Sequence, residues 1–224
     1  MFSACRSITS LDLSNWNTSN VTTTSEMFRY ASAIKSLDLS HFDMSKVTTV
    51  SYMFNQCYSL ENIIFPSLNM PLCTNMTYFI YSTVNCRQIS FGSSLSSGTL
   101  GTSALNYLYG DNYYTTEIDC TGLDASSITN PTNSFCNSYA LEKVILPASL
   151  HYIGASFFAN DRNLKTIVLP STTLVTLLNT NAFSGCSRAK TIYVPDNLVS
   201  SYQTADNWKS LTNVTFAGLS TLTS

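Results

Sequence analysis

Charged residues are scarce in this 224-residue sequence: Asp, Glu, Lys and Arg make up 11% of it, against roughly 25% in an average domain. The 11 basic residues are scattered along the chain and outnumbered by 13 acidic ones. Because nucleic-acid binding needs a concentrated basic surface, the composition excludes a nucleic-acid partner. Ser, Thr and Asn replace the missing charges, so we expect a surface made mainly of hydroxyl and amide groups.

Long apolar runs and the common catalytic motifs are also missing. No apolar run reaches the roughly 18 residues that a membrane-spanning helix needs. There is no phosphate-binding loop, dinucleotide fingerprint or HExxH motif. The two histidines, His41 and His151, fall in distant turns, so neither a Ser–His nor a Cys–His arrangement is supported. We therefore expect no enzyme activity and no cofactor.

Cysteine pairs with metal-site or redox spacing are absent. The chain has seven cysteines and no C-x-x-C motif, which argues against zinc and thioredoxin-like sites. Several cysteines stand at positions that are apolar elsewhere in the repeat described below, where a thiol behaves as a small hydrophobe. We expect buried, reduced thiols rather than a metal site or a disulfide framework.

The sequence repeats with a period near 26 residues. "SLDLSNWNTSNVT" occupies residues 10–22, and a near copy, "SLDLSHFDMSKVT", occupies residues 36–48. The units begin near residues 1, 27, 53, 79, 108, 134, 157 and 182. Such a period is typical of architectures in which stacked copies bury a shared core. We interpret residues 1–224 as a single repeat domain.

Two sets of apolar positions recur in the units. The second position is Phe2, Phe28, Phe54, Ile80, Tyr109, Phe135, Phe158 and Phe183, which predicts a buried spine. Later in each unit, two apolar residues flank one other residue, as Leu37 and Leu39 do. This alternation predicts a short strand with one face inward. Because every copy runs in the same direction, the strands should form a parallel sheet with right-handed connections.

The repeated phrases resemble known families. "SLDLSxFDxSxVT…MF" is similar to the 26-residue repeat of bacterial surface proteins, here in the N-terminal half. "LKTIVLP…AFSGCSRAKTIYVP" resembles the Treponema-type leucine-rich repeat of BspA-like proteins. The resemblance implies an α/β repeat solenoid, mostly β and irregular. The expected form is a right-handed leucine-rich-repeat horseshoe with one parallel strand per repeat. It also implies a place outside the cell or on the surface of a bacterium.

The two ends of the chain differ. Residues 195–208, "PDNLVSSYQTADNW", predict a short capping helix, and Val214 and Phe216 suggest a closing strand, so a cap is expected over about 196–224. At the other end Met1 already opens a repeat, which predicts an exposed edge or further repeats upstream. The start lacks the basic and apolar regions of a signal peptide, so a signal or anchor is expected outside this sequence.

A candidate ligand-binding face follows from the strand pattern. The residue between the two inward ones should point outward. This outward row comprises Asp12, Asp38, Ile64, Asp119, Ile145, Val168 and Tyr193, with Ser90 in the fourth unit. It changes from acidic to apolar, and exposed apolar patches often mark partners. One carboxylate per strand falls short of the roughly six to eight oxygens that Ca²⁺ takes, so we expect these Asp side chains to bond turns or water.

A second candidate is the irregular stretch 92–114. It is rich in Gly and Ser and then in Tyr, and it breaks the phase of the repeat. Tyrosine combines contact area with a hydroxyl, so Tyr107, Tyr113 and Tyr114 are candidate loop contacts. The same stretch is also consistent with a plain loop, and Tyr109 belongs to the spine and is expected in the core.

The sequence therefore predicts a non-enzymatic binding or adhesion module, secreted or on the cell surface. Its partner would be a protein or glycan of a host or bacterial surface, recognised across the exposed face of the parallel sheet. The alternative is a structural spacer that displays another domain of a larger surface protein. The pattern predicts no oligomeric state.

Overall fold

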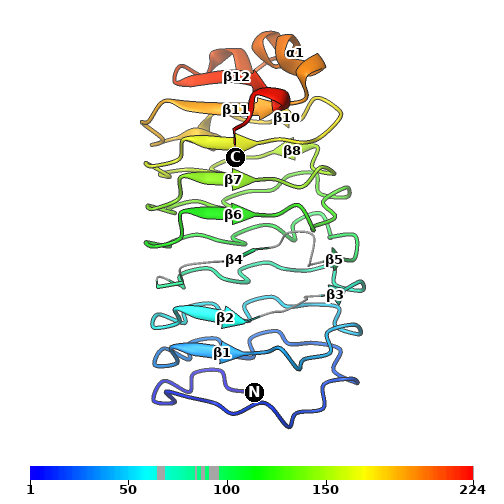
Figure 1. The fold of residues 1–224 in the computed structure, drawn as a ribbon, viewed down its shortest axis with the longest axis vertical. Helices are drawn as coiled ribbons and strands as arrows, with labels where there is room; N and C mark the ends of the chain where they lie inside the picture. The colour runs from blue at the N-terminus through cyan, green and yellow to red at the C-terminus, as the bar shows by residue number, and fades with distance from the viewer. Residues whose placement is uncertain (65–68, 84, 87–88, 91–95, 224) are drawn as a thin grey trace.

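The computed structural model describes residues 1–64, 69–83, 85–86, 89–90 and 96–223. The chain winds into an elongated stack of coils, with the N-terminus at one end and the helix α1 (Val199–Thr204) at the other (Figure 1). Most of the described residues lie in turns and short strands. Residues 92–95 of the predicted loop lie outside the described residues.

The strands of successive coils pair in parallel, and the largest sheet has the order β12–β11–β9–β7–β6–β4. Its strands are β4 (Ile89–Ser90), β6 (Glu117–Asp119), β7 (Lys143–Ile145), β9 (Thr166–Val168), β11 (Lys190–Val194) and β12 (Val214–Gly218). The predicted inward residues Val144 and Ile167 are partners in this register. In the N-terminal coils, β1 (Ser36–Asp38) pairs with β2 (Asn62–Ile64) in the same way. The predicted parallel pairing is confirmed.

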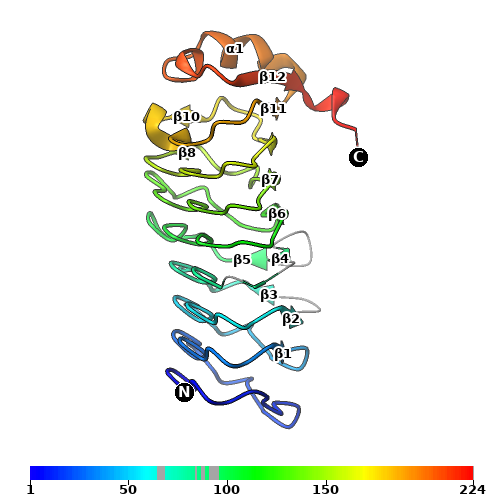
Figure 2. The same ribbon diagram turned by 90° about the vertical axis from the view of Figure 1, so that its left-hand side faces the viewer.

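Shorter parallel pairs complete the coils elsewhere. β3 (Asn69–Met70) pairs with β5 (Ser96–Ser97), and β8 (Tyr152–Ile153) pairs with β10 (Thr176–Leu177). Figure 2 shows β8 and β10 across the coil from β7 and β11. Isolated bridges join Thr23 to Thr49 and Thr49 to Asn75. Each coil is therefore hydrogen-bonded to its neighbours at more than one place on its circumference.

The first unit departs from the prediction of one strand per repeat. Residues 11–13 form no strand, although Leu13 is buried and Leu11 is half-buried. This coil lies at the end of the stack and has a neighbour on one side only (Figure 1).

The spine predicted from the second position of each unit is present. Phe28 is fully buried, and its ring centroid lies 5.8 Å from that of Phe2 and 5.7 Å from that of Phe54. In the C-terminal half, Phe158 lies 5.6 Å from Phe135 and 5.4 Å from Phe183. These residues also bond the next coil through their backbones. The spine thus joins neighbouring coils by apolar contact and by hydrogen bonds together.

Backbone N–H groups of the spine donate to carbonyls of the following coil. The N–H of Phe28 donates to the carbonyl of Met53 at 3.0 Å, one coil further along the chain. The N–H of Phe158 donates in the same way to the carbonyl of Ala182 at 2.8 Å. Since these groups are buried, their pairing removes a desolvation penalty that an isolated coil would carry.

Most coils have two residues in a left-handed backbone conformation, one before and one after the spine residue. Those before it are Glu26, Tyr52, Tyr78, Tyr107, Asn133 and Ser156. Those after it are Ala4, Tyr30, Gln56, Ser82, Asp111, Asn137, Asn160 and Gly185. This conformation costs about 1–2 kcal/mol for most residues with a Cβ, and Asn and Gly tolerate it best. Before the spine, Tyr52, Tyr78 and Tyr107 therefore stand where later coils have Asn133 and Ser156.

The predicted C-terminal cap contains the expected helix and strand. Tyr202 of α1 is fully buried and its Oη accepts a hydrogen bond from the N–H of Val175 at 2.9 Å. Trp208 is buried too, and its Nε1 donates to the carbonyl of the same Val175 at 2.7 Å. The 3₁₀ segments of this half are Thr180–Phe183, Asp196–Leu198, Trp208–Ser210 and Leu219–Thr221. The cap therefore covers the apolar end of the stack and hydrogen-bonds the backbone N–H and carbonyl of Val175.

The stretch that breaks the phase of the repeat is largely a regular coil. The N–H of Gly101 donates to the carbonyl of Thr74 at 2.8 Å, as the N–H of Thr74 donates to that of Thr48 at 2.9 Å. Leu100 and Tyr109 are fully buried. From residue 96 onward, the predicted irregular loop is therefore part of the stack, because its backbone and apolar side chains follow the neighbouring coils.

The spine predicts a large effect of truncation at its centre. Phe158→Ala should lower the free energy of unfolding by about 3–5 kcal/mol, since the ring is fully buried between two others. Urea unfolding followed by circular dichroism measures this. Leu178→Ala is the matched control, because Leu178 is 40% exposed and should change stability by about 0.5 kcal/mol or less. Equal effects of the two substitutions would contradict the spine's role.

Candidate functional site

The residues of the predicted outward row differ in exposure. Asp12 and Asp38 are exposed, whereas Asp119, Ile145 and Tyr193 are partly buried. Ile64 belongs to β2, but its side chain lies outside the described part of the structure. The row is thus most open to solvent at its acidic, N-terminal end.

Val168 corrects the predicted apolar patch, because it is only 4% exposed. The register places it directly between Ile145 of β7 and Tyr193 of β11. Both neighbours carry longer side chains, which flank the shorter valine and shield it from solvent. The surface here is therefore formed by the edges of Ile145 and Tyr193, and a continuous exposed row of three apolar side chains does not exist.

The Asp residues of the row bond their own turns, as expected from the sequence. Oδ1 of Asp12 accepts from the N–H of Ser14 at 3.0 Å and from its Oγ at 2.6 Å. Asp38 accepts from the N–H of Ser40 at 2.8 Å, and Asp119 from that of Thr121 at 2.9 Å. Hydrogen bonds from the serines, first from the side chain, lower the pKa of the Asp12 and Asp38 carboxyls. These carboxylates serve the turns that follow the strand position.

Paired charges flank the row on the sheet face. Lys143 Nζ lies 2.7 Å from Glu117 Oε1, and Lys165 Nζ lies 3.0 Å from Glu142 Oε1. Each pair joins neighbouring coils and is substantially exposed. Exposed pairs of this kind contribute little stability, but they leave this part of the face close to neutral.

The tyrosines predicted as loop contacts divide into two groups. Tyr107 is partly buried and stacks on Tyr78, with ring centroids 4.5 Å apart. Tyr113 and Tyr114 are each 54% exposed, and Tyr113 stacks on Tyr139 at 5.0 Å. Tyr107 is therefore a packing residue of the coil corner, whereas Tyr113 and Tyr114 remain available to a partner.

A tyrosine ladder, formed by Tyr52, Tyr78 and Tyr107, was not predicted from the sequence. Tyr52 stacks on Tyr78 at 4.6 Å, and the guanidinium of Arg29 lies 4.8 Å from the centroids of both Tyr52 and Tyr30. The three ladder residues immediately precede the first position of their units, in "YMF", "YFI" and "YLY". Reading that column in register would have revealed the ladder.

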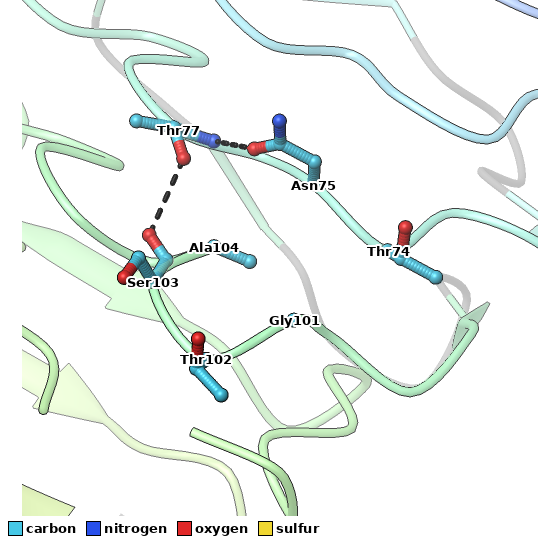
Figure 3. A pocket seen from close by; sticks show the side chains of 7 residues that line it. All are labelled: Thr74, Asn75, Thr77, Gly101, Thr102, Ser103 and Ala104. Carbon is cyan, nitrogen blue, oxygen red and sulfur yellow. Dashed lines mark hydrogen bonds between the residues drawn. The ribbon is translucent and has the colours of Figure 1, made fainter. Parts of the chain in front are cut away.

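A hollow of about 320 Å³ lies between two coils at the start of the tyrosine-rich stretch (Figure 3). It is lined by Thr74, Asn75, Thr77, Gly101, Thr102, Ser103 and Ala104. Oγ1 of Thr77 donates to the carbonyl of Ser103 at 3.3 Å, across the hollow. Gly101 has no side chain where the coil before it has Thr74, which opens the space. The lining has no titratable side chain, so it offers no acid, base or strong nucleophile.

Metal and acid–base chemistry find no support in the described part of the chain. No group of three or more His, Cys, Asp or Glu residues there could hold a metal ion. Lys190 is buried, but its Nζ donates to the carbonyls of Cys186 at 3.2 Å and Arg188 at 2.6 Å. Burial lowers its pKa, yet the ammonium is engaged in fixing the turn before β11.

The described residues contain no disulfide, and six of the seven cysteines are buried. Sγ of Cys57 donates to the carbonyl of Phe28 at 3.0 Å, and Sγ of Cys186 to that of Phe158 at 2.8 Å. Burial raises the pKa of both thiols to about 12. Since the thiolate is the reactive species, these cysteines are unreactive and act as small apolar side chains.

Asp161 is the most deeply buried acid among the described residues. Its Oδ1 accepts from the N–H of Ser138 at 2.7 Å, and its Oδ2 has no described hydrogen-bond partner. Burial raises its pKa well above the ordinary 3.8. The folded protein therefore keeps this proton at pH values where the unfolded chain has released it.

This difference predicts a pH-dependent stability. The contribution of neutral Asp161 is complete below about pH 4 and is lost as the pH rises toward the folded pKa, by up to about 1.4 kcal/mol per pH unit. Asp161→Asn removes the titration, so its free energy of unfolding should rise relative to the unmodified protein between pH 4 and pH 8. Urea unfolding across this range measures it. Asp206→Asn is the control, because Asp206 is an exposed acid whose pKa is lowered by Lys209, and it should lack this trend. If the free energy of unfolding of Asp161→Asn depended on pH in the same way as that of the unmodified protein, the assignment would be contradicted.

The comparison with protein families divides the chain into two parts. Residues 1–91 match a family described as "Mycoplasma protein of unknown function, DUF285". Residues 124–224 match the "BspA type Leucine rich repeat region", which occurs in 6 copies. Residues 124–224 are thus similar to the BspA-type leucine-rich-repeat family. The resemblance inferred from the sequence, with BspA-type repeats following a different repeat in the N-terminal half, is confirmed.

Solved structures of leucine-rich-repeat proteins also match the chain. One is a leucine rich cell surface protein from Faecalibacterium prausnitzii, at 16% identity over 86% of this chain, with a TM-score of 0.39. Another is a leucine-rich repeat protein from Bacteroides ovatus, at 17% identity over 96% of this chain, with a TM-score of 0.36. The matched part covers 62% of each of those chains. Among curated proteins no match is found.

In the described part of the chain, no helix has the length and apolar character required to cross a bilayer.

Proposed function

We propose that this chain is a non-enzymatic binding module of a bacterial cell surface. It recognises a protein or glycan across the outward face of its parallel sheet. The stack that presents this face is a right-handed leucine-rich-repeat horseshoe. The family match and the name of the Faecalibacterium relative support the surface location.

One observation carries the proposal: the inward and outward positions of the same strands vary differently. Val144, Ile167 and Ile192 are all apolar and fully buried. The outward row in the same register changes from acidic side chains in the first two units to Ile145 and Tyr193 in the later ones. The inward row meets the common requirement of packing, whereas the outward row is free to differ, as a recognition surface must.

The proposal predicts that one substitution on the face abolishes binding while the fold is kept. Purified protein should bind saturably to at least one component of a panel of immobilised glycans, mucin and matrix proteins. Tyr193→Lys should weaken that binding by at least about tenfold, because an aromatic side chain of the face is replaced by a charge. Biolayer interferometry measures this, and circular dichroism reports the fold.

Thr176→Lys is the matched control, because it places the same charge on an exposed strand residue of the separate β8–β10 pair. It should leave binding unchanged. Normal binding by Tyr193→Lys would contradict recognition through the sheet face. The competing function, a spacer that displays another domain, predicts no saturable binding to any component of the panel.

A further inference from the structure

A second hollow lies on the N-terminal coils, away from the outward row. It has a volume of about 270 Å³ and is lined by Arg6, Tyr30, Ser32, Gln56 and Tyr58. Sites for drug-sized ligands start at about 300 Å³, so this hollow suits one small ring rather than a large molecule.

The hollow arises from side-chain size at one repeat position. Arg6, Ser32 and Tyr58 occupy the same position in three successive coils, 26 residues apart. The small serine between two long side chains leaves a notch, and strand spacing sets about 9–10 Å between its two ends. Tyr30 and Gln56 form the remaining walls.

The aromatic and amide walls are held in place by their own contacts. Oη of Tyr58 donates to Oε1 of Gln56 at 2.7 Å. Nη2 of Arg29 donates to Oη of Tyr30 at 3.2 Å, and its guanidinium lies 4.8 Å from the centroid of that ring. The walls are therefore ordered before any ligand arrives, which lowers the entropy lost on binding.

Two residues that line the hollow have a left-handed backbone conformation. Tyr30 and Gln56 have φ angles of 60° and 59°. At the same repeat position, later coils use Asn137, Asn160 and Gly185, which tolerate this conformation better. The same conformation recurs at this position in Ala4, Ser82 and Asp111, so it is a general feature of the repeat.

Arg6 supplies an uncompensated charge at one end of the hollow. Its side chain is exposed, and its guanidinium lies 6.0 Å from the centroid of Tyr30. Among the described residues no carboxylate forms an ion pair with it, whereas Arg29 is paired with Glu26 at 3.1 Å. A guanidinium matches a carboxylate through two parallel hydrogen bonds.

We propose that this hollow binds a monosaccharide unit that carries a carboxylate, such as a uronic or sialic acid of a glycan. Arg6 binds the carboxylate, Gln56 and Ser32 bond the hydroxyls, and the ring of Tyr58, which is 44% exposed, covers the apolar face of the sugar. The combination of aromatic ring, amide, hydroxyl and guanidinium favours a sugar acid over a peptide carboxylate. This site does not depend on recognition through the sheet face.

Titrations followed by nuclear magnetic resonance test the proposal on the full chain. The probes are D-glucuronate, N-acetylneuraminate and D-glucose. At least one sugar acid should bind about tenfold or more tightly than glucose, with saturable shifts at Arg6 and Tyr58. Arg6→Gln should remove this preference, Arg6→Lys should restore part of it, and Tyr58→Ala should weaken binding of sugar acids and glucose alike.

Arg162→Gln is the matched control, because Arg162 is exposed and occupies the same repeat position in another coil. It should leave all affinities unchanged. Three results would overturn the proposal: sugar acids that bind no better than glucose or not at all, an unchanged preference in Arg6→Gln, or binding of N-acetyl-L-aspartic acid α-amide, which keeps its side-chain carboxylate, as tight as that of the sugar acids. The last result would identify an acidic peptide as the occupant.

Discussion

Contact between successive coils at the spine is the interaction on which the rest of this structure depends. Phe2 and Phe28 occupy the same repeat position, yet Phe2 in the end coil is only partly buried and Phe28 is fully buried. The difference is the presence of a coil on both sides of Phe28. A coil of this size cannot bury its apolar side chains alone, so stability accumulates from contacts between neighbours. The cap around Tyr202 and Trp208 supplies that contact at the last coil.

This constraint separates the residues that stacking of the coils requires from the residues that are free to vary. Inward side chains and spine amides are fixed by stacking, whereas Asp12 and Asp38 of the outward row and Tyr58 face solvent. At the corners the same left-handed position carries Tyr30 in one coil and Gly185 in another. The scaffold therefore accepts very different side chains at its surface without a change of path. Both proposed binding surfaces use such positions, the sheet face through Tyr193 and the hollow through Tyr58.

Much of this architecture could be predicted from the sequence, because a 26-residue period and a two-residue alternation specify which side chains are buried together. The spine and the strand register follow from those two periods, whereas the capping helix follows from the pattern of residues 195–208. The burial of Val168 follows from neither, because it depends on the sizes of Ile145 and Tyr193 in the adjacent coils. Residue type does not reveal the left-handed backbone of the tyrosines, whereas the stacking of Tyr107 follows once Tyr52, Tyr78 and Tyr107 are read in register.

Hydrogen exchange of individual backbone amides tests the central claim, that the coils are held together at the spine, most directly. The account predicts the slowest exchange at spine amides such as Phe54 and Phe158, whose N–H groups bond the next coil. It predicts faster exchange at Phe2 of the open end coil. The amides of Ser14 and Ser40, bonded to exposed Asp side chains, should exchange fastest of these. Equal rates at spine and turn amides, or slower exchange at Phe2 than at Phe158, would contradict the account.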